Sequence, residues 1–362
     1  MGNSISERNS SIELLRIVCM IMILNLHAFF IPATLTWGTL SFANIVTIFS
    51  ESLSICAVNS FVLISGYFSI KWKWRGFLSL IFQVYFFVFL IYFALLLVGV
   101  LQFKWSDFFF RANCIRYSYW FVTSYVVMYI VSPILNVFVE NASKKQLLYF
   151  LIAFYLIETY LCTAGEIFAS GYSPLHFVGL YLLGRTINKY PVKKLESVGF
   201  SAAMYVIATV CIAILFIGYK IFTSNTKTTF DLPGCYSNPL VVIQSVALFF
   251  IFKNLKIKSK VINWCSISIL SVYLLHMHPD VKQYYYDHTA SLYGLSVFDR
   301  FIHLVILFAA IFVVSILIDK LRVLCFSVCW NFGCVVKERI KLKCCHRRED
   351  GVVGRQRSEF TE

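Results

Sequence analysis

The first predicted membrane-crossing segment of the chain carries two side chains that could do chemistry, a guanidinium and an imidazole. Arg16 and His27 are eleven residues apart, and at about 100° per residue this spacing returns a helix to nearly the same face. The rise between them is about 16 Å, roughly half the thickness of a bilayer core. We therefore expect an arginine near one membrane surface and a histidine near the midplane, aligned along one stripe.

Each of these two residues has a chemical and a structural interpretation. An arginine can hold phosphates or a thioester carbonyl, but Arg16 could instead reach the membrane surface and pair with Glu13, which shares its face. A neutral imidazole can act as a general base or carry an acyl group itself, and the sequence does not separate these routes. His27 could instead only bond a neighbouring helix. Because a charge in the bilayer core costs at least about 2.5 kcal/mol, a shared site is the interpretation that explains both residues.

The composition places these residues in a membrane. Hydrophobic residues make up 59% of the 362 residues and charged residues 14%, whereas about 25% of a soluble domain is charged. This excludes a soluble enzyme, a nucleic-acid-binding protein and a disordered chain. The net charge of +14 is therefore interpreted as a topology signal, and no nucleic acid is expected as a partner.

Apolar runs of spanning length predict an all-α, polytopic membrane protein with about ten transmembrane helices. Most of the 32 Lys and Arg residues fall in alternate loops and in the tail, which predicts that both termini are cytoplasmic and that the protein is a multi-pass protein of the inner cell membrane. The first run is not expected to be a cleaved signal peptide, because it lacks a small-residue cleavage site. The runs are 12–32, 43–69, 77–101, 118–138, 147–164, 172–188, 199–221, 239–252, 261–278 and 301–318.

The chain is predicted to have two parts. Residues 1–322 form one integral-membrane domain, and residues 323–362 form a basic cytoplasmic tail that is partly amphipathic and then disordered. The tail contains residue types that bind zinc but not the paired spacing of a zinc site, so no metal is predicted. These residues are Cys334, Cys344, Cys345 and His346.

Five short stretches, taken together, carry a family resemblance. The segment RIVCMIMILNLH, from Arg16 to His27, resembles the Arg-x10-His signature of the acyltransferase 3 family, which are polytopic membrane O-acyltransferases. Four later stretches resemble motifs of that family in the expected order, so that the resemblance covers residues 12–322. They are NSFVLISGYF (59–68), YWFVTSYVVMYIVSPILN (119–136), FVGLYLLGRTI (177–187) and SISILSVYLLHMHP (266–279).

The resemblance implies an acyltransferase that uses a cytoplasmic acyl-CoA, usually acetyl-CoA, as donor. The acceptor would be a hydroxyl of a cell-surface or lipid-linked saccharide, as in polysaccharide O-acetylation, and membrane lipid and saccharide are the expected partners. Arg16 and His27 become the expected catalytic pair, with Arg16 also contacting the donor. His276 is expected to face the acceptor, or else to make a structural hydrogen bond.

The donor is expected to contact the second run and the basic residues that follow it. Lys71, Lys73 and Arg75 could attract nucleotide phosphates, although they could equally be positive charge that only sets topology. Members of the family often carry a further Arg in the next helix, where this chain has Gln83. Ser65 and Gly66 could offer a hydroxyl or an N–H to a developing oxyanion, or could simply end a helix. 

The acceptor is expected to contact aromatic residues. Trp120 and Tyr125 could stack on a sugar ring, although a tryptophan at an interface can also be an anchor. His278 and His288, which flank a tyrosine-rich outer segment, are expected at the surface.

Two other functions compete with this prediction. A transporter or flippase of a glycan precursor would also be polytopic with midplane charges, but no inverted repeat is visible and the charged groups gather on one run. A non-catalytic member of the same fold is the other alternative, and the intact pair of Arg16 and His27 argues against it.

Overall fold

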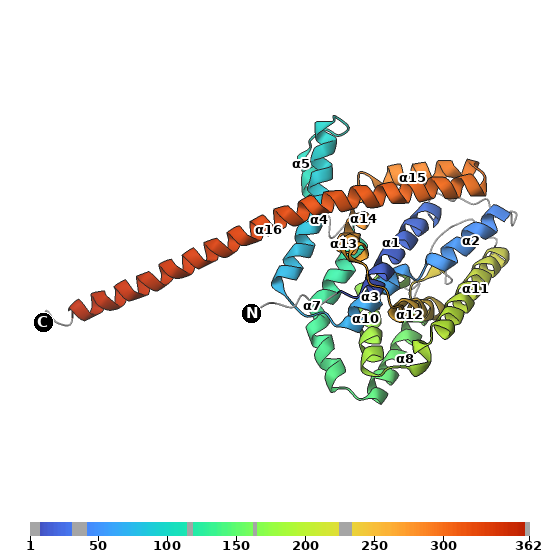
Figure 1. Ribbon diagram of the computed structural model, residues 1–362, viewed down its shortest axis with the longest axis horizontal. Helices are drawn as coiled ribbons and strands as arrows, with labels where there is room; N and C mark the ends of the chain where they lie inside the picture. Colours follow the sequence, from blue (N-terminus) through green and yellow to red (C-terminus); the bar gives the residue numbers. More distant parts are fainter. Residues whose placement is uncertain (1–7, 31–41, 114–118, 162–164, 224–233, 359–362) are drawn as a thin grey trace. The chain divides into compact units, whose positions relative to one another are not determined.

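The computed structural model describes residues 8–30, 42–113, 119–161, 165–223 and 234–358, and every regular element in these ranges is a helix. The predicted all-α class is therefore confirmed (Figure 1). Short 3-10 helices, η1 (Ala169–Gly171), η2 (Lys193–Glu196) and η4 (Leu292–Gly294), lie between α-helices. The α-helices are α1 (Ser10–Phe30), α2 (Phe42–Ser54), α3 (Ala57–Phe68), α4 (Trp74–Leu97), α5 (Trp105–Ala112), α7 (Trp120–Asn141), α8 (Lys144–Tyr160), α9 (Gly165–Phe168), α10 (Pro174–Lys189), α11 (Val198–Thr223), α12 (Pro239–Lys253), α13 (Lys260–Ser266), α14 (Ile269–His276), α15 (Lys282–Ser291) and α16 (Val297–Ser358).

Six stretches of the described chain are long and apolar enough to cross a membrane, which identifies a multi-pass membrane protein. Helix α12 is also apolar but shorter. The six stretches are Ser10–Ala28, Phe42–Phe68, Trp74–Leu97, Trp120–Asn141, Val198–Tyr219 and Val297–Gly333.

Two of the predicted runs are each divided into two helices. The run 43–69 forms α2 and α3, and the run 261–278 forms α13 and α14. Serine hydroxyls explain the second break: that of Ser266 donates to the Asn263 carbonyl, and that of Ser271 donates to the Ser268 carbonyl. Such local bonds compete with the regular backbone ladder of a helix.

The last helix crosses a boundary between two compact units, residues 1–316 and 317–362. Helix α16 contains both the run 301–318 and the segment predicted to be an amphipathic tail. Within the second unit, Asp319 and Arg322 form a two-pronged ion pair one turn apart, with the Arg322 Nε 2.9 Å from an Asp319 oxygen. Helix α16 ends at Ser358, and mobility of the polar tail stays a prediction.

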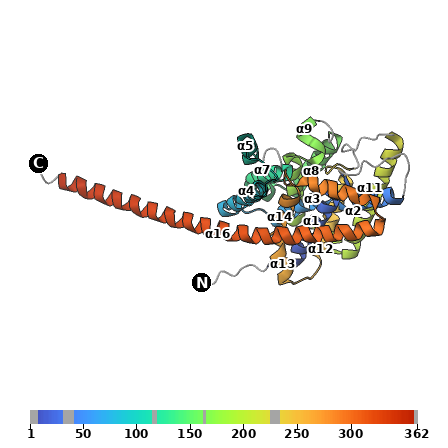
Figure 2. The same cartoon turned by 90° about the horizontal axis from the view of Figure 1, so that it is seen from above.

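Within residues 1–316, helix α1 lies at the centre and contacts α2, α3, α12, α13, α14 and α15 (Figures 1 and 2). Its start is capped by Asn9, whose side-chain oxygen accepts a hydrogen bond from the Ser11 N–H at 3.1 Å. Leu15, Cys19 and Leu24 on this helix are completely buried. The helix that carries Arg16 and His27 is therefore enclosed by segments from distant parts of the sequence.

Helices α3 and α10 cross at two glycines that let their backbones touch. A methyl group on Gly66 would overlap the Tyr181 carbonyl, and one on Gly184 would lie 2.6 Å from the Leu63 carbonyl oxygen and 2.7 Å from the Tyr67 nitrogen. Small residues at such crossings are the usual means of close packing between membrane helices. The Gly66 that the sequence associates with donor binding therefore packs against α10.

We expect Gly184→Ala to lower the melting temperature of the purified protein in detergent. The added methyl group must push two backbones apart, and overpacking of this kind costs about 1–3 kcal/mol. Gly218→Ala is the matched control, since a methyl group there meets nothing within 4 Å. Equal melting temperatures for Gly184→Ala and the unaltered protein would contradict this account of the crossing.

Candidate active site

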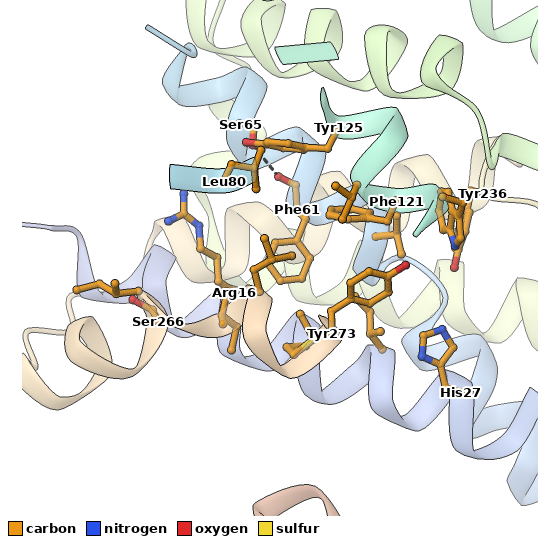
Figure 3. A pocket seen from close by; sticks show the side chains of 18 of the residues that line it. Arg16, His27, Phe61, Ser65, Leu80, Phe121, Tyr125, Tyr236, Ser266 and Tyr273 are labelled. Atoms are coloured by element: carbon orange, nitrogen blue, oxygen red, sulfur yellow. Dashed lines mark hydrogen bonds between the residues drawn. The ribbon is translucent and has the colours of Figure 1, made fainter. Parts of the chain in front are cut away.

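A cavity of about 300 Å³ runs along α1 and joins the two residues that the sequence singles out. Arg16, Met20, Ile23 and His27 all line it, and their spacing is that of one helix face. The predicted shared face of Arg16 and His27 is thus confirmed. Figure 3 shows the arginine and the histidine toward opposite ends of the cavity.

Arg16 is held by its own helix at one end of the cavity. Its Nη1 atom donates to both carboxylate oxygens of Glu13, each at 3.1 Å, and Glu13 is buried. Arg8 also lines the cavity and lies 3.9 Å from Glu13. The Glu13 carboxylate therefore orients Arg16 while the arginine still lines the cavity. The ion pair with Glu13 and a role of Arg16 in binding a substrate are thus compatible.

Two hydroxyl groups lie on the cavity wall at the Arg16 end (Figure 3). The Ser65 and Tyr125 oxygens are 3.2 Å apart, and the Ser65 hydroxyl is also 3.2 Å from the Phe61 carbonyl oxygen. If Ser65 donates to that carbonyl, its oxygen accepts the proton of Tyr125. The neighbouring Gly66 lies in the α3–α10 crossing and is not among the residues that line the cavity.

At the other end of the cavity, His27 pairs with His276 of helix α14. The His27 Nδ1 and His276 Nε2 atoms are 2.9 Å apart, and the His276 Nδ1 is 2.6 Å from the Val272 carbonyl oxygen. The carbonyl can only accept, so the His276 Nδ1 carries a proton. With both rings neutral, the His276 Nε2 accepts from the His27 Nδ1–H, and the lone pair of His27 lies on its Nε2. The pair thus selects the tautomer with a basic Nε2.

Helix α15 supports this pair, although its tyrosine-rich sequence predicts an outer loop. The Tyr285 hydroxyl donates to the Leu24 carbonyl of α1 at 2.7 Å, and its ring centroid is 5.4 Å from that of His276. The prediction that His278 lies at the surface is wrong. It is completely buried, with its Nε2 3.2 Å from the Val88 carbonyl oxygen, whereas His288 is exposed as expected.

Three aromatic rings form one wall of the cavity, and we call them the aromatic wall. Trp120 lies 4.4 Å from Tyr172 and 6.0 Å from Tyr236 between ring centroids, and the last two are 4.6 Å apart. The turn before Tyr172 has left-handed backbone at Ser170 (φ 56°) and Gly171 (φ 87°), and the Ser170 carbonyl accepts from the Tyr236 N–H at 2.9 Å. Of these three residues the sequence indicates only Trp120. Tyr172 and Tyr236 could not be predicted, because this turn is what brings them to Trp120.

A buried polar network fixes the same wall from behind. The His176 Nδ1 is 3.0 Å from both Glu158 oxygens, and its Nε2 is 3.1 Å from the Asn59 side-chain oxygen. The Asn59 amide donates to the Tyr236 carbonyl at 2.8 Å, which makes its oxygen an acceptor toward His176. The His176 ring therefore bridges the Glu158 carboxyl group and the Asn59 side chain. No hydrogen bond of this network reaches His27. The network anchors Tyr236 through its backbone carbonyl.

The basic set predicted for donor phosphates lies elsewhere. Lys71, Lys73 and Arg75 are exposed, between α3 and the first turn of α4, and none of them lines the cavity. Gln83, which replaces a further arginine in this region, is buried in α4.

The residues whose side chains the structure describes contain no cluster of three or more His, Cys, Asp or Glu able to hold a metal ion. The side chains of Cys334, Cys344, Cys345 and His346 lie outside the described part.

Comparison with protein families identifies the chain. The family model for an acyltransferase domain of the acyltransferase 3 type matches residues 9–320, which include every helix that lines the cavity. The chain belongs to the acyltransferase 3 family. It is therefore a membrane protein of an acyltransferase family, with its cavity inside the matched region. Comparisons with curated proteins and with solved structures each return no match.

We expect nitrogen-15 NMR of histidine-labelled protein to show His27 protonated at Nδ1 and unprotonated at Nε2 at neutral pH. The bond to His276 dictates this tautomer, and spectra of His27→Ala assign the signals. A His27 ring protonated at Nε2 alone would contradict the described pair.

Proposed function

We propose that this acyltransferase 3 protein moves an acyl group, acetyl in the first instance, from cytoplasmic acyl-CoA to a hydroxyl of a cell-surface or lipid-linked saccharide. The observation that carries the proposal is one cavity with Arg16 at one end and, at the other, His27 with its lone pair on Nε2. The family match supports the reaction class. The acetyl group, the donor and the saccharide acceptor are parts of the proposal.

The proposed topology has ten crossings of the inner cell membrane and both termini in the cytoplasm. The six long stretches are completed by α8, α10, α12 and the α13–α14 pair. Arg16 then lies near the cytoplasmic surface and His27 near the midplane. In this orientation the donor enters the cavity past Arg16, and the acceptor reaches His27 from the outer side.

The proposed reaction uses the lone pair of the His27 Nε2. In the direct route this nitrogen takes the proton of the acceptor hydroxyl while the oxygen attacks the thioester carbonyl carbon; the C–S bond breaks, and the CoA thiolate takes the proton from His27. In the covalent route Nε2 attacks the thioester carbonyl carbon, and the C–S bond breaks to release the CoA thiolate. The acceptor oxygen then attacks the acyl carbon, the bond from that carbon to Nε2 breaks, and the thiolate takes the hydroxyl proton.

His276 acts as a positioning residue in either route. A positive charge that develops on His27 makes its Nδ1–H a stronger donor to the His276 Nε2, 2.9 Å away. Since His276 is held by the Val272 carbonyl, the accepting nitrogen is already in place before the reaction.

The two ends of the cavity suit different substrates. Arg16, with the hydroxyls of Ser65 and Tyr125 nearby, offers donors to the thioester arm and to the charge that develops on its carbonyl oxygen. The aromatic wall of Trp120, Tyr172 and Tyr236 offers ring faces on which a sugar can stack.

We expect His27→Ala to reduce acyl transfer from acetyl-CoA by at least about 10²-fold, because the base or nucleophile is removed. His276→Ala should retain more activity, since it removes only the positioning bond. Transfer is measured by mass spectrometry of surface glycans in cells that carry each variant at equal membrane abundance. His288→Ala, at an exposed histidine, is the matched control, and full activity in His27→Ala would overturn the proposed function.

We expect Trp120→Ala to raise the KM for the acceptor roughly threefold to tenfold, the range expected for the loss of one aromatic contact. The acceptor for this assay is the glycan that differs between cells with and without the protein. Trp105→Ala, at an exposed tryptophan outside the cavity, serves as control. An unchanged acceptor KM together with a raised donor KM would assign the aromatic wall to the donor instead.

A further inference from the structure

A second cavity, of about 580 Å³, lies at the start of α1. Its walls are residues 8–11, residues 255–260 and Asn263 of α13. Arg8 lines both this cavity and the one that contains Arg16 and His27. The two cavities therefore share one lining arginine, on the side of α1 from which the donor is proposed to enter.

Two serines at the start of α1 hold the opposite wall in place. The Ser11 hydroxyl donates to the Leu255 carbonyl at 2.7 Å and accepts from the Ile257 N–H at 3.1 Å. The Ser10 oxygen accepts from the Ser259 N–H at 3.0 Å. These bonds all use backbone groups of residues 255–260, so the side chains of that segment are left for other contacts.

The held segment presents a row of cations. Its sequence, LKIKSK, places Lys256, Lys258 and Lys260 at alternate positions, and all three side chains are exposed and line the cavity. Alternate residues of an extended segment point to the same side. We call these three residues and Arg8 the basic row.

The charge of the three lysines in the basic row is uncompensated within the cavity. No Asp or Glu is among the described residues that line it, and none of the ion pairs in the described part of the chain includes Lys256, Lys258 or Lys260. Arg8 lies 3.9 Å from Glu13, whose carboxylate also pairs with Arg16. The N-terminus of the long helix α1 adds a partial positive charge to the same wall. A roomy cavity with this charge suits an anion that carries several phosphates.

We propose that the basic row binds the nucleotide end of acyl-CoA, with its diphosphate and 3′-phosphate, and that the pantetheine arm passes Arg8 into the first cavity. The assignment rests on the proposed function. The rise along α1 from Ser10 to His27 is about 26 Å, a distance that an extended arm of two amide units and a diphosphate is suited to cover. The thioester then lies beside His27 while the phosphates stay at the membrane surface.

This assignment differs from one of the two interpretations that the sequence leaves open for a second basic set. Lys71, Lys73 and Arg75 line neither cavity, so they fit the interpretation as topology-setting charge. They are also a set of three inside-facing cations in the proposed topology, which makes them a matched control for the three lysines of the basic row.

The test is equilibrium binding of CoA to the purified full chain in nanodiscs of zwitterionic lipid. We expect the triple variant K256A/K258A/K260A to bind CoA at least about tenfold more weakly, because three charge-assisted contacts to phosphate are lost. The control triple K71A/K73A/R75A should change the affinity by less than about twofold, as expected for exposed charges away from the ligand. The charge-preserving K256R/K258R/K260R should restore binding, and melting temperatures confirm that each variant is folded.

A second measurement uses the unaltered protein and needs no variant. CoA should bind more tightly than 3′-dephospho-CoA, and both more tightly than pantetheine. Equal affinities for CoA and pantetheine would overturn the proposal, as would an equal loss of affinity in both alanine triples.

The outcomes separate this inference from the proposed function. If acetyl-CoA supports transfer and the basic-row triple binds CoA normally, the inference fails and the proposed function stands. If the unaltered protein binds no CoA, both fail. Nanodiscs that contain anionic lipid distinguish a headgroup from the donor: loss of CoA binding there would show that the basic row holds lipid phosphates and would overturn the proposal.

Discussion

A polar group within an apolar membrane core must find a partner, and the arrangement of this protein follows from that constraint. Arg16 bonds Glu13, His27 bonds His276, and His176 lies between Glu158 and Asn59. The last two sets join helices far apart in the sequence. The bond between His27 and His276 links α1 to α14, so a polar contact as well as packing fixes the rotation of α1 and of the two candidate functional residues that it carries.

The same constraint accounts for the chemistry that the site offers. A histidine that bonds water can adopt either tautomer, whereas a His27 bonded to an accepting nitrogen keeps its lone pair on Nε2. A guanidinium bonded to a carboxylate one turn away can stay at the cavity wall without a second partner. Membrane burial therefore selects the tautomer and orientation that the proposed acyl transfer needs, and the aromatic wall lines the proposed acceptor end.

The features that depend on local periodicity could be predicted from the sequence. The shared face of Arg16 and His27 follows from the helical repeat, and the helical membrane class follows from composition.

The partner of His27 could not be predicted, because it comes from 249 residues away and its motif gives no geometry. The aromatic wall depends on a left-handed turn at Ser170. The tyrosine-rich segment is polar in sequence and has no clear apolar face, so the burial of Tyr285 could not be predicted either. The sequence does not distinguish Lys256, Lys258 and Lys260 as a binding site, because every inside loop of a membrane protein is expected to be basic.

The central claim is that donor and acceptor meet at the Nε2 atom of His27 in the cavity along α1. An experimental structure of the protein bound to a non-hydrolysable thioether analogue of acetyl-CoA tests it most directly, with an antibody fragment added for cryo-electron microscopy. We expect density for the pantetheine arm along α1, with the acyl carbonyl beside His27 and the arm passing Arg16. An analogue bound outside this cavity, or one whose acyl end lies away from His27, would contradict it.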